Sequence, residues 1–307
     1  MITPLRFHTL DVFTDTPYAG NPLAVVLDAE DLDTTQMQTI AREFNLSETI
    51  FVMPPQDPAN TARVRIFFPT AEIPFAGHPT LGCAALLAGL RNGAGDFEDR
   101  IVLEEEAGLV PVSVRREGTT LRGEFVAPVI PFSHDREIEA DLLAKALDLP
   151  EDALGFGAHS AGVFEGGPAF LYAPVRDLDA LGRSRPVEPH WSALMAASGV
   201  DSAYLYTSDG DVGYRARMYS PTAGIPEDPA TGSASAILAA QLLAAGALGE
   251  GENAVALTQG VEMGRESHIT LTACVRDGSL REVRIGGSAL RMNEGELTPP
   301  PRPKVSP

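Results

Sequence analysis

Two short polar segments of the chain contain residue types that can move protons and hold a small ligand. The first begins at Gly77 and His78, and the second runs from Asp228 through Gly232 to Ser233. A histidine can donate a hydrogen bond or relay a proton, an aspartate can orient an amine or hydroxyl, and a serine can bond a ligand's polar edge. We therefore predict catalytic roles for His78 and Asp228, and substrate contacts for Gly77, Gly232 and Ser233.

Each segment opens a predicted helix. Pro79 and Pro229 suit the start of a helix, because the N–H group that proline lacks would be unpaired there anyway. Two helix N-termini pointing into one cleft would offer unpaired N–H groups and positive dipole ends to a carboxylate-sized anion. Taken singly, His78, Asp228 and Ser233 have a simpler explanation as helix caps.

The elements that must position these residues occur twice. The segment Arg63 to Pro74 recurs as Arg215 to Pro226, an offset of 152 residues with seven of twelve positions identical. In both halves the expected order is helix, strand, strand, turn and helix, at residues 37–44, 49–53, 62–68 and 79–90, and again at 190–197, 203–207, 214–219 and 233–244. The pattern predicts two α+β lobes related by a pseudo-twofold axis, with the repeated turns facing a cleft; the alternative is a recurrent structural turn.

Glu48 lies between the first helix and an apolar strand. A glutamate in such a loop is ordinarily a solvated surface charge. When the two halves are aligned, Ser202 stands opposite Glu48, so the acid is not part of the repeated framework, although a slip of one residue would bring Asp201 there. A partly desolvated carboxyl at a cleft can have a raised pKa and shuttle protons. Glu48 is therefore our candidate catalytic acid and base.

The domain boundaries follow from the repeat and from the prolines. We expect an N-terminal lobe at residues 1–126, joined by a returning segment near 285–297, and a C-terminal lobe at 127–284. Residues 126–133 contain two prolines and suit a linker before a helix at 138–149. The tail, residues 298–307, contains five prolines and is predicted to be flexible.

Composition excludes several classes of function. The chain has 307 residues and a net charge of −19, and such a field repels phosphate backbones, so we predict no nucleic-acid partner. No apolar run reaches the roughly 18 residues of a membrane span, and the first ten residues do not resemble a signal peptide. We therefore expect a cytoplasmic enzyme or binding protein that does not associate with membranes.

The cysteines and histidines predict neither disulfides nor a metal site. Cys83 and Cys274 cannot form a disulfide framework, and the six histidines lack the spacing of metal ligands. Two-lobed racemases that work without cofactors need one thiol from each lobe. Cys83 falls within a helix and Cys274 within an alternating strand, and both are interpreted as small core residues.

Several motifs together resemble the PhzF-like family of phenazine-biosynthesis isomerases. They are Phe13 to Val26, the Asn-Leu-Ser-Glu-Thr segment around Glu48, Phe75 to Thr80, and Glu227 to Ala234. Gln259-Gly260 and Gly286-Gly287 also fit the pattern. The resemblance covers nearly the whole chain in the right order.

This resemblance implies a diaminopimelate epimerase-like fold, in which each lobe wraps a curved mixed sheet around a central helix. It also implies a homodimer that needs no cofactor. The family's acid/base role corresponds to Glu48, and its other site residues correspond to His78, Asp228 and Ser233. The sequence departs from the epimerases where Ala76 replaces their first cysteine, and no cysteine occurs in residues 228–235. Proton transfer by one carboxylate is therefore favoured over two thiols.

These observations predict a cofactor-independent isomerase that moves a proton within a small unsaturated or cyclic amino or hydroxy carboxylate. The family's prototype reaction isomerises trans-2,3-dihydro-3-hydroxyanthranilate. Two alternatives stay open. One is a thiol-independent racemase or epimerase of an amino acid, and the other is a non-catalytic small-molecule-binding protein of the same fold.

Overall fold

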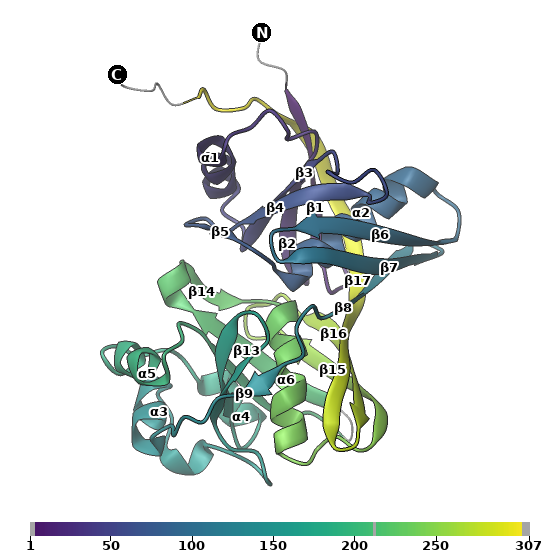
Figure 1. Ribbon diagram of the computed structural model, residues 1–307. Helices are drawn as coiled ribbons and strands as arrows, with labels where there is room; N and C mark the ends of the chain where they lie inside the picture. Colours follow the sequence, from purple (N-terminus) through teal and green to yellow (C-terminus); the bar gives the residue numbers. More distant parts are fainter. Residues whose placement is uncertain (1–3, 211–212, 303–307) are drawn as a thin grey trace. The chain divides into compact units, whose positions relative to one another are not determined.

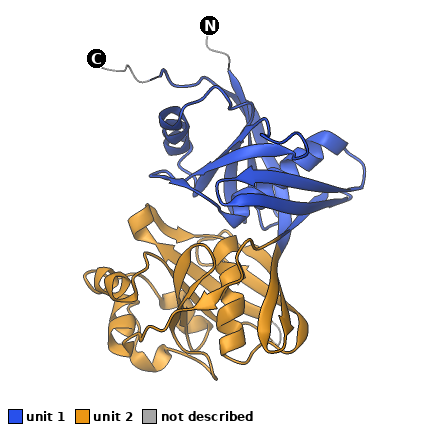
Figure 2. Cartoon of the chain, viewed as in Figure 1, with its two compact units in different colours: residues 1–125, 286–307 blue, residues 126–285 orange. Residues whose placement is uncertain are grey.

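The computed structural model describes residues 4–210 and 213–302. The chain divides into two compact units, residues 1–125 with 286–307 and residues 126–285 (Figure 2). Within the described residues, no helix is long and apolar enough to cross a membrane.

Unit 1 is a ring of strands around one helix (Figure 1). β17 pairs with β1 and with β8, and the order between them is β1, β2, β3, β4, β6, β7 and β8. α2 packs against β1, β2, β3, β6 and β7. The bounds are β1 Leu5–Val12, β2 Asn21–Val26, α1 Thr34–Phe44, β3 Glu48–Met53, β4 Ala62–Phe67, β5 Glu72–Ile73, α2 Gly77–Asn92, β6 Phe97–Glu105, β7 Gly108–Glu117, β8 Thr120–Val126 and β17 Ser279–Leu297. Residues 279–285 of β17 belong to unit 2.

The helix α2 is buried along most of its length because its residues are small. At Gly82 a Cβ atom would lie 2.7 Å from side-chain carbons of both Leu23 and Val12. Glycine therefore lets the helix approach β1 and β2 closely. The helix ends at Gly93, which has a positive φ of 74°.

The helix α1 covers a second small core of unit 1. It begins with the expected capping box, in which Asp33 and Gln36 each accept a hydrogen bond from the other's backbone N–H. Its buried face includes Met37, Ile40 and Ala41, with Phe44 packed beside them. This confirms the helix face predicted from the 3.6-residue periodicity.

Unit 2 is built from a second set of strands with its own helix α6. β10, β11, β12, β13, β15 and β16 pair in that order, and α6 packs against β9, β10, β11 and β16 (Figure 1). The bounds are β9 Phe132–Ser133, α3 Ala140–Ala146, η1 Glu151–Ala153, β10 Gly162–Glu165, β11 Ala169–Pro174, α4 Leu178–Arg183, α5 His190–Ser198, β12 Ala203–Ser208, β13 Gly213–Ser220, η2 Pro221–Ala223, β14 Ile225–Asp228, α6 Gly232–Ala244, β15 Gly251–Gln259 and β16 Ser267–Arg276.

The two units contain the same pairing pattern. In unit 1, β2 and β3 are parallel, β3 and β4 antiparallel, and β4 and β6 parallel. In unit 2, the same relations join β11 to β12, β12 to β13, and β13 to β15. The register pairs Thr49 with Phe67 and Ala203 with Tyr219, and Phe67 and Tyr219 are 152 residues apart. Ser202 is thus the counterpart of Glu48, as the sequence alignment predicts.

One partly buried ion pair is also repeated. Arg65 Nε and Nη2 donate to both oxygens of Glu72 at 2.6 Å, and the guanidinium lies 5.3 Å from the Phe67 ring centroid. In unit 2, Arg217 bonds Glu227 in the same bidentate manner at 2.8 Å and lies 5.1 Å from the ring of Tyr219. The arginines and the aromatic rings are each related by the 152-residue offset.

Candidate active site

Glu48 is the first residue of β3 and is only 6% exposed. The chain reaches it from the end of α1, where Asn45 adopts the left-handed conformation with φ 51° and turns the backbone toward the strand. Leu23 of β2 is its partner in the parallel register. The interpretation of Glu48 as a solvated surface charge is therefore wrong, because the sheet holds the carboxyl inside unit 1.

His78 is the second residue of α2, and its side chain meets that of Glu48. Its Nδ1 atom lies 3.3 Å from Glu48 Oε2 and 3.3 Å from Asn21 Nδ2. The imidazole is 2% exposed, and its Nε2 atom has no hydrogen-bond partner among residues 4–210 and 213–302. One imidazole nitrogen thus faces the carboxyl, and the other is a buried polar atom with no hydrogen-bond partner among the described residues.

Burial lowers the pKa of His78 to about 3, although a hydrogen bond with the Pro22 backbone opposes this shift. The imidazole is therefore neutral at ordinary pH, and its contact with Glu48 is not an ion pair. Nδ1 can donate to an ionised Glu48, or it can accept a hydrogen bond from a protonated Glu48. A neutral imidazole can therefore pair with either protonation state of the carboxyl, as the Nδ1–H tautomer with the carboxylate and as the Nε2–H tautomer with the acid.

Asn21 completes this cluster, and its role was not predicted from the sequence. It is fully buried at the start of β2. Gly20 directly before it has a φ of 66°, and a Cβ atom there would lie 2.4 Å from the Val12 carbonyl oxygen. A polar residue at the start of an apolar strand is a visible signal, but its contact with His78 spans 57 residues and is created only by the fold.

The corresponding region of unit 2 forms a separate polar cluster around Asp228. Thr231 donates its hydroxyl to Asp228 Oδ2 at 2.6 Å, and Gln259 Nε2 donates to the Asp228 carbonyl at 2.8 Å. The Thr231 N–H donates to Gln259 Oε1 at 3.2 Å. Asp228, Thr231 and Gln259 are all buried. The network fixes the Asp228 carboxyl at the end of β14, three residues before the α6 N-cap.

Gly77 and Gly232 are the first residues of α2 and α6, and both are buried. The N-cap residues are Ala76 and Thr231, and within the described part of the chain neither helix has a side-chain cap bond. Helix capping therefore does not explain His78 or Asp228. Ser233 lies half-buried in the first turn of α6. Unit 1 thus brings together Gly77, His78 and Glu48, and unit 2 brings together Asp228, Gly232 and Ser233.

Residues 10–295 match the sequence model of the family described as phenazine biosynthesis-like protein. The chain belongs to this PhzF family. It is 34% identical over 294 residues to trans-2,3-dihydro-3-hydroxyanthranilate isomerase of Pseudomonas chlororaphis, covering 95% of this chain and 99% of that relative. An uncharacterised isomerase of Mesorhizobium japonicum is 42% identical over 295 residues, covering 94% and 96%. The family resemblance seen in the sequence is confirmed.

Comparison with solved structures shows which proteins share this fold. A PhzF-family phenazine biosynthesis protein of Bacillus anthracis has a TM-score of 0.83 at 25% identity, covering 96% of this chain and 99% of that one. A hydroxyproline epimerase of Agrobacterium vitis has a TM-score of 0.60 at 16% identity over 96% and 91% of the chains, which shows a shared fold alone. The expected mixed α and β class is confirmed. The expected isomerase class agrees with the names of the family's members.

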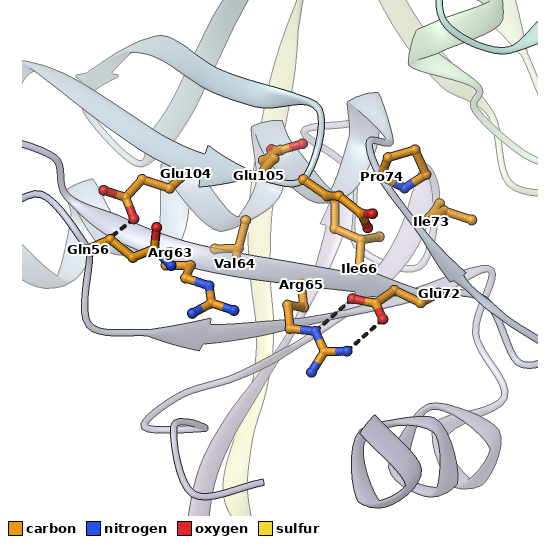
Figure 3. Close-up of a pocket in the computed structure, with 11 residues that line it drawn as sticks. Gln56, Arg63, Val64, Arg65, Ile66, Glu72, Ile73, Pro74, Glu104 and Glu105 are labelled. Carbon is orange, nitrogen blue, oxygen red and sulfur yellow. Dashed lines mark hydrogen bonds and ion pairs between the residues drawn. The ribbon is translucent and has the colours of Figure 1, made fainter. Parts of the chain in front are cut away.

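A separate cavity of about 440 Å³ opens in unit 1 (Figure 3). It lies where β4 passes from its pairing with β6, at Arg63, to its pairing with β5, at Ile66. Arg65 and Glu72 form their ion pair at its wall. Its lining residues are Gln56, Arg63, Val64, Arg65, Ile66, Glu72, Ile73, Pro74, Glu104, Glu105 and Glu106. Glu48 and His78 are not among these lining residues. The candidate active site is therefore defined by the contact between those two side chains and not by this cavity.

Proposed function

We propose that this PhzF family member is an isomerase that moves a proton within a small unsaturated or cyclic amino or hydroxy carboxylate, with Glu48 as the acid and base. The observation that carries the proposal is the buried contact of 3.3 Å between Glu48 and the neutral His78. The repeat supports it as well, because unit 2 has Ser202 at the equivalent position. A carboxyl required only by the framework would have no reason to differ in this way.

The proposed reaction begins with an ionised Glu48 that removes a proton from a substrate carbon. The electron pair left behind shifts into the conjugated system, and Glu48 is now protonated beside His78. Glu48 then returns the proton to a different carbon of the same substrate, so that no atom or electron is gained or lost overall. General acid–base catalysis of this kind contributes about 10²- to 10⁴-fold in rate.

His78 and the start of α2 would stabilise the charge that develops during the transfer. The Nε2 atom of His78 has no partner among the described residues, and as a neutral imidazole it can donate a hydrogen bond to a carboxylate or a ring oxygen. The N–H groups of the first turn of α2, beginning at Gly77, provide the positive end of the helix dipole. Both features favour an anionic substrate despite the net negative charge of the protein.

The unit 2 cluster is proposed to serve the same reaction. Asp228 would orient an amine or hydroxyl of the substrate, and Gly232 and Ser233 would bind its polar groups. We also propose that the units are two halves of one pseudo-symmetric repeat of the diaminopimelate epimerase-like fold, and that the protein is a homodimer. The shared pairing pattern supports the repeat, and light scattering would test the dimer.

The experiment is exchange of carbon-bound hydrogen in D₂O, followed by NMR. The protein is incubated with trans-2,3-dihydro-3-hydroxyanthranilate and with a panel of unsaturated amino and hydroxy acids. We expect exchange and isomerisation in wild type, and a loss of at least about 100-fold in Glu48→Gln, which is nearly isosteric. Circular dichroism checks the fold, and Glu43→Gln, at an exposed position on α1, serves as the matched control.

Three outcomes would contradict the proposal. Full turnover in Glu48→Gln would remove the glutamate from the mechanism. Inversion at one carbon without isomerisation, seen by chiral analysis, would identify a racemase or epimerase. Binding of the panel compounds without any exchange would identify a non-catalytic binding protein.

A further inference from the structure

A second buried carboxyl, Glu105, is linked to the start of α2. Glu105 is the last residue of β6 and is 8% exposed. Its Oε1 atom lies 2.7 Å from the Thr80 hydroxyl oxygen, which in turn lies 2.7 Å from the carbonyl oxygen of Ala76. Ala76 is the N-cap of α2 and directly precedes Gly77 and His78. The chain of contacts therefore ends at the turn that carries the catalytic histidine.

Counting hydrogens indicates the protonation state of Glu105. The Thr80 hydroxyl has one hydrogen and two acceptors at 2.7 Å, so it can donate to only one of them. If it donates to Ala76, the second contact requires a hydrogen from Glu105. The Oε2 atom of Glu105 has no hydrogen-bond partner among the described residues. An ionised carboxylate would leave a poorly solvated charge there, and a neutral acid satisfies both short contacts.

The internal repeat supplies an independent comparison. Arg63 pairs with Glu104 in unit 1, and Arg215, its counterpart at the 152-residue offset, pairs with Thr258 in unit 2. The next residues, Glu105 and Gln259, are therefore equivalent. Gln259 contacts Thr231, the N-cap of α6 and so the counterpart of Ala76: its Oε1 accepts from the Thr231 N–H at 3.2 Å and its Nε2 donates to the Thr231 hydroxyl at 3.0 Å. A neutral side chain thus holds the helix start in unit 2 by direct donation, as Glu105 does in unit 1 through Thr80.

We propose that Glu105 is a positioning residue that works as a neutral carboxylic acid, donating through Thr80 to Ala76 and so holding His78 in place. This inference rests on the proposed function for its effect on turnover. Its structural part, the link to the first turn of α2, is independent of any substrate.

The electrostatic surroundings of Glu105 agree with a neutral acid. Burial raises the pKa of Glu105 to about 8, and the contact with Thr80 only partly opposes this shift. From α2, the Cys83 thiol lies near the carboxyl, and burial raises its pKa above the ordinary range, so it is protonated. His78 on the same helix is neutral. Neither group supplies a positive charge that would favour ionisation of Glu105.

The remaining charged groups line the cavity beside Glu105 (Figure 3). Arg65 of β4 is neutralised by Glu72 of β5. Glu104 accepts hydrogen bonds from the backbone N–H groups of Gln56 and Asp57 and from the Asn60 amide. The other two charged groups of the wall are Arg63 and the exposed Glu106. Burial, rather than any of these charges, is the largest cause of the pKa shift of Glu105.

The test is amide hydrogen exchange of the first turn of α2 as a function of pH, corrected for intrinsic exchange rates. The Thr80 N–H, which donates to the Ala76 carbonyl at 3.2 Å, is the reporter. We expect its protection in wild type to fall by about tenfold between pH 7 and pH 9.5, as Glu105 ionises. In Glu105→Gln, which copies unit 2, protection should be high and should change by less than about threefold over the same range.

Three further variants test the link between Glu105 and the start of α2. Glu105→Leu removes the donor, so the first turn of α2 should lose protection at all pH values. Gln259→Glu places an ionisable group at the equivalent position, so the start of α6 should acquire a pH dependence that it lacks in wild type. Glu106→Gln changes an exposed charge on the adjacent residue and should leave the pH dependence of the Thr80 amide unchanged.

Turnover supplies the second readout. The kcat of wild type should fall above pH 8, and in Glu105→Gln this fall should disappear while kcat at pH 7 is retained. The inference is overturned if wild type and Glu105→Gln show the same pH dependence of Thr80 protection. If the Glu48→Gln variant keeps full turnover while Thr80 protection still depends on Glu105, the proposed function fails and the link between Glu105 and α2 stands.

Discussion

Replacing Glu105 with glutamine should change the pH dependence of the free energy of unfolding in a direction that the structure determines. The pKa of this carboxyl is raised from 4.5 to about 8 by burial at the end of β6. Between these two pH values the native protein holds a proton on Glu105 that the unfolded chain has released. The unfolded state then binds fewer protons than the native state, so stability falls as pH rises.

The size of this effect follows from the width of the pH interval. One pKa unit corresponds to about 1.36 kcal/mol, so an interval of roughly 3.5 units gives a loss on the order of 5 kcal/mol between pH 4.5 and pH 8. Above pH 8 both states have released the proton and this contribution becomes constant. Glutamine does not titrate, so the difference in stability between Glu105→Gln and wild type should grow over the same interval and then level off.

The assay is urea denaturation from pH 4.5 to pH 9, read by circular dichroism and by exchange mass spectrometry of peptides covering residues 97–117. The protein has one tryptophan, Trp191, which is buried in unit 2. Its fluorescence therefore reports on the unit that does not contain Glu105. Parallel stability curves for wild type and Glu105→Gln between pH 4.5 and pH 8 would refute the reasoning, because they would show that Glu105 is ionised in the native state.

Two other predictions follow from buried polar groups. The pKa of His78 is lowered to about 3, so below pH 6.5 the unfolded chain binds a proton that the native state excludes. Wild type should therefore lose stability relative to His78→Gln as pH falls from 6.5 toward 3, measured by urea denaturation. Equal slopes of the free energy of unfolding against pH in the two proteins would argue against a neutral imidazole. Arg217 donates hydrogen bonds to Glu227 and to three carbonyl groups of residues 181–184. The substitution Arg217→Met should therefore lower the free energy of unfolding by about 3–5 kcal/mol. The more exposed Arg65→Met should cost about 1–2 kcal/mol, and similar losses in thermal unfolding would contradict this ranking.

The repeat explains why much of the framework could be predicted from the sequence. The segments Arg63 to Pro74 and Arg215 to Pro226 contain alternating strands followed by small-residue helices, and both signals are local. The structure places β4, β13, α2 and α6 within one or two residues of the expected bounds. The predicted strand begins at residue 49, so Glu48 is expected in the loop directly before it, and the structure makes Glu48 the first residue of β3. Alignment of the two halves identified Ser202 as its counterpart.

The contacts between these elements could not be predicted in the same way. Asn21 reaches His78 across 57 residues, and the long strand β17, Ser279–Leu297, pairs with β1 from the other end of the chain. The run Glu104 to Glu106 is typical of a solvated surface. Only the alternation of β6, in which Ile101, Leu103 and Glu105 are all buried, shows that the middle glutamate points inward. Residues 303–307 of the predicted flexible tail lie outside the described residues. In the described part of that tail, the Pro300 carbonyl accepts a hydrogen bond from Gln36.

Two of the positions at which the repeat changes charge lie in unit 1 near α2. Glu48 replaces the serine of unit 2 beside His78, and Glu105 replaces the glutamine that holds the helix start. In the proposed reaction the first carboxyl must gain and lose a proton, whereas in its proposed positioning role the second works only while it keeps one. Burial at the end of β6 keeps Glu105 protonated at neutral pH, and the neutral imidazole of His78 lies beside Glu48. In the proposed mechanism, proton transfer by Glu48 therefore does not require Glu105 to change its charge, and it becomes sensitive to Glu105 only at alkaline pH.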